Sequence, residues 1–247
     1  MITKANYQNE YSWLFSPYAV MQIRMNGQLL LLMLSERLLE LGATIHQVNT
    51  DGVLYSLKKA KLDELNVVIE EFQKLSRLNF ETEEFTAFYQ LAVNDYFGFQ
   101  PNGEIKEKGS FITKVRRGKG LTPTIIPKAV IKYFLEGIKP EEYIKSCTDI
   151  KDFLMSEKTG KQWHVEYNSQ PQQRTNRFYA STNGYFLYKW KMDKGEKKYQ
   201  NMLTASGVTL LNNFDNLPKD PKINYQYYIT EANKIIAQFK NKQLSLF

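Results

Sequence analysis

Two stretches in the first third of the chain repeat apolar residues every three or four positions, which is the spacing of a helix. Residues 17–41 are leucine-rich. Ser16 precedes them as an N-cap residue, Pro17 suits the first helical position, and Gly42 follows their end. Residues 59–78 carry the second stretch. Both are predicted to be helices, and the first, apolar almost all round, is expected to be buried under a sheet.

Shorter apolar and aromatic runs between and after these helices predict strands. Residues 43–49 and 53–57 predict a hairpin around Asp51-Gly52. Residues 80–88 and 89–99 predict two further strands, with a solvated acidic face at positions 81, 83 and 84 and a turn at 101–103. Helix, hairpin, helix and strands together predict an α+β fold, in which helices pack on one face of an antiparallel sheet.

The pattern changes after residue 111. The basic, glycine-rich stretch 114–123 predicts a junction, followed by helices over 124–137 and from 140 into the 150s. Residues 163–212 are β-rich, and strands over 174–181 and 184–190 are expected to join at Asn183-Gly184. A last helix is predicted over 225–239. The chain is therefore expected to continue as a mixed helical and β region.

Composition narrows the possible functions. The 247 residues are 43% apolar and 14% aromatic, enough for a packed core. A net charge of +7 makes a polyanion the natural partner, although a merely basic surface would give the same value. The single cysteine, Cys147, fits a reducing cytoplasm. The longest apolar run, 29–34, is far shorter than the ~18 to 20 residues of a membrane span, so no membrane partner is expected.

Asp51-Gly52 has two interpretations that the residues alone leave open. Between alternating apolar residues, this pair is a strong signal for an ordinary hairpin turn. The same turn also holds a carboxylate at the tip of a hairpin, and carboxylate oxygens are the ligands that Mg²⁺ prefers. The neighbouring segments decide which interpretation the sequence favours.

Several segments follow one another in a recognisable order: 28–42, Asn49-Thr50-Asp51-Gly52, Val93-Asn94-Asp95-Tyr96, 103–109, 126–138, 174–179 and 224–229. This series resembles the C-terminal part of a family B DNA polymerase, particularly the replicative polymerases of tailed bacteriophages. The resemblance covers nearly the whole chain. It implies that residues 1–111 are the C-terminal part of the palm, that 112–242 are a thumb-like region, and that 243–247 are a tail.

The resemblance implies a DNA-directed DNA polymerase that joins deoxynucleoside triphosphates to a primer paired with its template. Asp51 matches the family's hairpin metal ligand, so it is the expected catalytic residue and ligand of Mg²⁺. Asn49 stands where the family commonly has a further acid, and it is expected, with Thr50, to support Asp51 from behind. The upstream acid motif of the family has no match here. We therefore expect the isolated chain to be inactive without an N-terminal polymerase polypeptide that carries the other catalytic acid.

DNA contacts are expected at two places. Tyr96 matches a primer-contacting tyrosine of the family, although a core aromatic would fit the same strand. A dense basic run contributes charges that suit the DNA backbone, or simply a solvated loop; its members are Lys106, Lys108, Lys114, Arg116, Arg117 and Lys119.

The last five residues resemble the peptide with which bacterial replication proteins bind the sliding clamp. Leu246 and Phe247 would enter an apolar pocket, Leu244 would lie beside them, and Gln243 would supply hydrogen bonds. Packing of the same residues at the end of the last helix is the alternative.

Two other functions stay open from the sequence. The chain could be a non-catalytic DNA-binding or replisome-tethering module derived from a polymerase, or an unrelated basic α+β binding protein in which Asp51-Gly52 is only a turn. The third possibility leaves the order of the segments unexplained.

Overall fold

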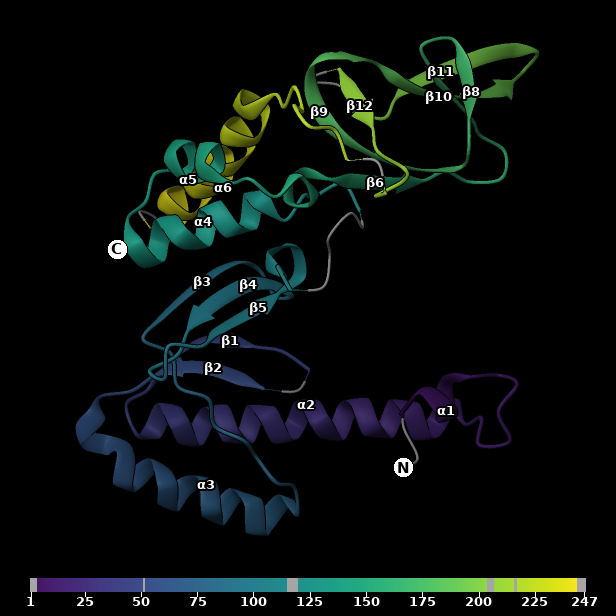
Figure 1. The fold of residues 1–247 in the computed structure, drawn as a ribbon. Helices are drawn as coiled ribbons and strands as arrows, with labels where there is room; N and C mark the ends of the chain where they lie inside the picture. The colour runs from purple at the N-terminus through teal and green to yellow at the C-terminus, as the bar shows by residue number, and fades with distance from the viewer. Residues whose placement is uncertain (1–3, 51, 115–119, 204–206, 216, 244–247) are drawn as a thin grey trace. The chain divides into compact units, whose positions relative to one another are not determined.

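The computed structural model divides the chain into two compact units, Met1–Glu83 and Glu84–Phe247 (Figure 1). It describes residues 4–50, 52–114, 120–203, 207–215 and 217–243. All strand pairs in the described residues are antiparallel, and helices accompany the sheets. The predicted α+β class is therefore confirmed.

The first unit is built on one long helix and a hairpin. Its elements are α1 (Lys4–Gln8), α2 (Pro17–Glu40), β1 (Thr44–Val48), β2 (Val53–Ser56), the 3₁₀ turn η1 (Lys59–Lys61) and α3 (Leu62–Ser76). The Ser16 hydroxyl accepts a hydrogen bond from the Ala19 amide at 3.2 Å and so caps α2, as the sequence predicts. The predicted helices and hairpin are confirmed.

The long helix α2 is buried on one face only. Leu34 and Leu38 pack with Phe72 of α3 and with the hairpin. On the opposite side, Leu29 and Leu32 are more than half exposed. The expected burial of this helix under a sheet holds for one face only, which packs against the two short strands and α3.

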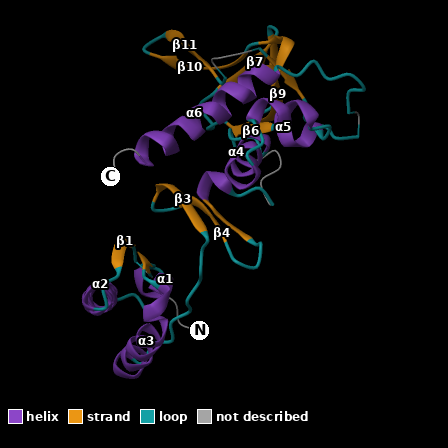
Figure 2. Cartoon of the chain, turned by 90° about the vertical axis from the view of Figure 1, so that its left-hand side faces the viewer, coloured by secondary structure: helices purple, strands orange, loops and turns teal. Residues whose placement is uncertain are grey.

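Among the described residues, the second unit contains three sheets and three α-helices. Sheet β3-β4-β5 comes first in the chain, helices α4 and α5 follow, the strands of the sheets β12-β9-β6 and β11-β10-β7-β8 come next, and helix α6 comes after them (Figure 2). Their bounds are β3 (Ala87–Ala92), β4 (Asp95–Phe99), β5 (Ile105–Lys108), η2 (Gly109–Phe111), α4 (Ile125–Glu136), α5 (Pro140–Ser146), η3 (Ile150–Phe153), β6 (Met155–Lys158), β7 (His164–Tyr167), β8 (Gln170–Gln172), β9 (Thr175–Tyr185), β10 (Leu187–Asp193), β11 (Glu196–Asn201), β12 (Val208–Leu210) and α6 (Tyr225–Gln243).

Aromatic rings join the first of these sheets to the helices. The Phe97 ring of β4 lies 6.0 Å from Phe134 of α4 and 5.6 Å from Phe239 of α6. Tyr89 of β3 lies 4.3 Å from Phe134. Strands β3 to β5 therefore belong to the compact unit that includes the helices, whereas the sequence groups them with the region before residue 111.

Two strand predictions are wrong. Residues 80–86 form no strand, so the acids at 81, 83 and 84 lie in a loop, and the hairpin turn falls at Val93-Asn94 between β3 and β4. Strand β9 runs through Asn183-Gly184 without turning. A Cβ on Gly184 would collide with the Val208 carbonyl, so this glycine permits close strand approach and does not form a turn.

Among the described residues, no helix is both long enough and apolar enough to cross a membrane.

Candidate nucleic-acid and metal sites

The β1–β2 hairpin brings the predicted metal-site segment to an exposed turn. Val48 pairs with Val53, and the Asn49 amide donates to the Gly52 carbonyl at 3.0 Å, which closes the turn. The Asn49 and Thr50 side chains are exposed. Asp51 lies outside the described residues, so its role as catalytic residue and Mg²⁺ ligand stays a prediction.

The rest of the hairpin is anchored in the core of the first unit. Ile45 and Tyr55 are cross-strand partners, and both pack against the cluster around Leu38 and Phe72. Burial raises the pKa of the Tyr55 hydroxyl above its usual value. The residues that the structure describes include no group of three His, Cys, Asp or Glu side chains placed to hold a metal ion.

In the second unit, one sheet face brings together three of the predicted DNA-contacting residues. Tyr96 of β4 pairs with Lys108 of β5, and Gly98 pairs with Lys106. Directly paired residues of an antiparallel sheet project from the same face. Tyr96, Lys106 and Lys108 therefore form a lysine–tyrosine face, while Phe97 points into the core on the other side.

Aromatic rings pack against Tyr96 on the lysine–tyrosine face. The Phe88 ring lies 4.8 Å from Tyr96 and 5.1 Å from Phe85. A Cβ on Gly98 would meet the Phe85 ring at 2.6 Å, so only glycine leaves room for this ring over the strand. Tyr96 is half-buried by these contacts, and its role as a DNA contact stays a prediction.

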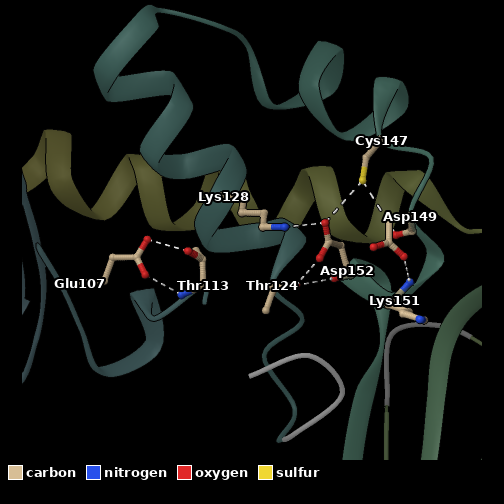
Figure 3. A network of polar contacts seen from close by, with 8 residues as sticks. All are labelled: Glu107, Thr113, Thr124, Lys128, Cys147, Asp149, Lys151 and Asp152. Carbon is tan, nitrogen blue, oxygen red and sulfur yellow. Dashed lines mark hydrogen bonds and ion pairs between the residues drawn. The ribbon is translucent and has the colours of Figure 1, made fainter. Parts of the chain in front are cut away.

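Polar contacts fix the backbone that follows β5 and leads to the remaining members of the basic run. The Asp95 carboxylate accepts hydrogen bonds from the Ser110 amide at 2.6 Å and its hydroxyl at 2.7 Å. The Glu107 carboxylate accepts from the Thr113 amide at 2.8 Å and its hydroxyl at 2.6 Å (Figure 3). These contacts set the direction of the chain up to Lys114, which is exposed. Arg116, Arg117 and Lys119 lie outside the described residues.

A buried ion pair links the start of α4 to η3, a feature that sequence reasoning missed. Lys128 Nζ lies 2.6 Å from the Asp152 carboxylate, which also accepts from the Thr124 hydroxyl at 2.9 Å (Figure 3). Asp152 is only 5% exposed, and its ion pair and hydrogen bonds offset the cost of burying a polar side chain. No sequence spacing signals this pair, since its members lie far apart along the chain.

The cysteine beside this pair is not prepared for nucleophilic chemistry. Cys147 is half-buried, and its sulfur lies 3.8 Å from the Asp152 carboxylate. Burial, with the nearby negative charge, raises the pKa of the Cys147 thiol above its usual value. The thiol is therefore protonated at neutral pH.

Two arginines without an assigned function in the sequence have structural contacts. Arg174 Nη2 donates to the Thr159 carbonyl at 3.0 Å. The Arg177 guanidinium lies 5.5 Å from the centre of the Phe214 ring. Between them, Asn176 is fully buried and accepts a hydrogen bond from Asn212 at 3.1 Å.

Helix α6 ends at Gln243, and nothing is described of that side chain. Leu244, Leu246 and Phe247 also lie outside the described residues, so clamp binding by the tail stays a prediction.

Comparison with known proteins finds similarity in structure but none to a family model or a curated protein. The chain is similar in structure to the family B DNA polymerase from the hyperthermophilic archaeon Pyrobaculum calidifontis, with a TM-score of 0.46 and 11% sequence identity. The match covers 92% of this chain and 30% of the polymerase, so the chain spans less than a third of that protein's length.

Proposed function

We propose that this chain is the C-terminal palm and thumb part of a DNA-directed DNA polymerase. The observation that best supports the proposal is the lysine–tyrosine face. The sequence predicts Tyr96, Lys106 and Lys108 as DNA contacts, and they share one face of a three-stranded sheet. A tyrosine beside two lysines of the neighbouring strand suits a phosphate backbone, because the ammonium groups neutralise phosphates and the hydroxyl donates a hydrogen bond.

In this proposal the β1–β2 hairpin contributes half of a metal site. Asp51 supplies a carboxylate for Mg²⁺, and Asn49 and Thr50 border it at the turn. These side chains offer oxygen atoms, which Mg²⁺ prefers as ligands, but they are too few to hold the ion by themselves. When bound, Mg²⁺ ions stabilise the charge that develops on the triphosphate and the primer oxygen. The second carboxylate comes from an N-terminal polymerase polypeptide.

A non-catalytic DNA-binding module is the second candidate, and the distribution of charge favours it. Residues 84–247 carry 25 Lys and Arg against 16 Asp and Glu, whereas residues 1–83 carry 8 against 10. The net charges are therefore +9 and −2. The basic excess lies entirely in the unit that does not contain Asp51. In this second candidate, residues 84–247 bind DNA without the β1–β2 hairpin.

Primer extension separates the two candidates. The chain is assayed with primer-template DNA, deoxynucleoside triphosphates and Mg²⁺, alone and mixed with a polypeptide that supplies the family's upstream acid motif. We expect synthesis only in the mixture, and loss of synthesis with Asp51→Ala because one metal ligand is removed. Asp63→Ala is the matched control, since Asp63 is an exposed aspartate in the same unit.

The outcomes separate the two candidates and test the role of Asp51. DNA binding without synthesis in the mixture would leave the tethering module as the function. Synthesis by the chain alone, abolished by Asp51→Ala, would show that the second polypeptide is not needed. Synthesis that survives Asp51→Ala would remove Asp51 from the catalytic site.

A further inference from the structure

A second candidate surface lies on the β11-β10-β7-β8 sheet of the second unit, which contains none of the predicted DNA-contacting residues. Trp190 of β10 pairs with Tyr199 of β11 on one side and with His164 of β7 on the other. Paired residues share a face, so these three rings form a row across three strands. Tyr188, two residues before Trp190, lies on the same face. We call these four residues the aromatic face.

The rings of the aromatic face are in contact. His164 and Trp190 are stacked, with centroids 4.4 Å apart and planes 24° from parallel. Trp190 lies 6.3 Å from Tyr199, and Tyr199 lies 6.4 Å from Tyr188. The row therefore places four adjacent aromatic rings on one face of the sheet, with His164 stacked against one side of the Trp190 ring.

The aromatic face is turned to solvent, whereas the opposite face belongs to the core. On the core side, Leu187 is 1% exposed and Val165 is 3% exposed. On the aromatic side, Tyr199 is 55% exposed and His164 is also exposed. The tyrosine and histidine rings thus contribute little to the core, and aromatic groups left in water mark a binding surface.

Positive charge lies beside these rings at the β10–β11 turn. The β10–β11 hairpin closes through Lys194 and Gly195, both with positive φ, the form of a tight two-residue turn. Lys197 Nζ lies 4.3 Å from the centre of the Trp190 ring. Lys197 projects from the aromatic face and Lys194 lies in the adjoining turn, whereas Lys189, Lys191 and Lys198 project from the opposite face.

We propose that the aromatic face binds single-stranded DNA, with unpaired bases stacked on Trp190 and Tyr199 and phosphates neutralised by Lys194 and Lys197. Exposed bases stack on aromatic side chains without a sequence requirement, and lysines follow the backbone. The paired bases of a duplex have no free faces, so the rings select unpaired DNA. The choice of DNA as the nucleic acid rests on the proposed polymerase function, in which an unpaired template strand is always present.

Fluorescence gives a direct test with the full chain. The protein contains three tryptophans, and stacking on a base quenches the ring that it covers. Short oligothymidylate is titrated into the wild type, Trp190→Phe and Trp163→Phe. We expect quenching to disappear with Trp190→Phe and to persist with Trp163→Phe. Trp163 is the matched control because it lies under Lys189 and Lys191 on the opposite face of the same sheet.

Affinity is measured in parallel by anisotropy of labelled oligothymidylate. Removing a stacking ring weakens binding by about ten-fold in comparable surfaces, so we expect this loss with Trp190→Ala and with Tyr199→Ala. Trp163→Ala is expected to change affinity by less than about two-fold. Tyr199 lies on the exposed edge strand, so its variant keeps the test decisive if Trp190→Ala does not fold.

Three results would overturn the proposal. Unchanged quenching in Trp190→Phe would show that no base covers this ring. Equal losses with Tyr199→Ala and Trp163→Ala would indicate general damage to the sheet. Equal weakening of single-stranded and duplex DNA by Tyr199→Ala would show that unpaired bases are not recognised.

Primer extension tests the proposed polymerase function, whereas oligothymidylate binding tests the aromatic face. If the chain never supports primer extension but Tyr199→Ala weakens oligothymidylate binding, the aromatic face remains a DNA site and the polymerase function is rejected. If the chain supports extension through Asp51 but Tyr199→Ala leaves oligothymidylate binding unchanged, the polymerase function remains and the aromatic face is rejected as a DNA site.

Discussion

Leu38 and Leu39 are adjacent residues of α2 in opposite environments. Leu38 is fully buried in the core of the first unit, and Leu39 is 55% exposed. We expect Leu38→Ala to lower the free energy of unfolding by about 2–5 kcal/mol, because it removes buried methyl groups and leaves a cavity. Leu39→Ala is expected to change it by less than about 0.5 kcal/mol. Urea denaturation followed by circular dichroism measures both, and similar losses would mean that Leu39 is also covered.

The same pair shows what the sequence reveals about single residues. A leucine-rich segment predicts a helix, and Ser16-Pro17 predicts where it begins, because both signals are local. Which leucine is buried depends on the neighbouring elements, and a helix that is apolar on both sides contains no information about that choice. For the same reason the Lys128–Asp152 pair could not be predicted, since only the fold brings its members within 2.6 Å.

At the scale of elements, hairpins were predictable where the turn signal and the strand pattern agreed. The β1–β2 hairpin has both, and the pairing of Val48 with Val53 follows. Asn183-Gly184 carries the same signal but lies inside β9, because its glycine serves the approach of β12. The aromatic face could have been noticed from alternation of aromatic residues with lysines over 188–199, but the contribution of His164 depends on strand pairing.

Gly184→Ala tests this explanation of β9. A Cβ at this position would collide with the Val208 backbone, so β9 and β12 would have to separate. We expect a loss of about 1–3 kcal/mol in the free energy of unfolding, as for overpacked sites. Gly160→Ala in the same unit should cost much less, because there the added carbon meets the flexible end of Gln162. Denaturation curves that give equal losses for the two variants would contradict the close-approach role.

At the scale of the whole molecule, the lysine–tyrosine face should account for part of the salt dependence of DNA binding. The logarithm of the binding constant falls linearly with the logarithm of salt concentration, with a slope of about −0.9 for each neutralised phosphate of duplex DNA. Substituting Lys106 and Lys108 together by alanine is therefore expected to reduce the magnitude of the slope by about 2. Anisotropy of labelled primer-template DNA over a series of salt concentrations measures it.

A matched pair of lysines in the other unit controls for net charge. Lys58 and Lys59 are adjacent, exposed, and belong to the unit whose net charge is −2. Replacing both by alanine changes the charge of the protein by the same amount as the Lys106 and Lys108 substitution. Because direct phosphate contacts determine the slope, we expect the control pair to leave it unchanged. Equal slope changes in the two double variants would mean that DNA responds to overall charge, and the lysine–tyrosine face would then have no specific role.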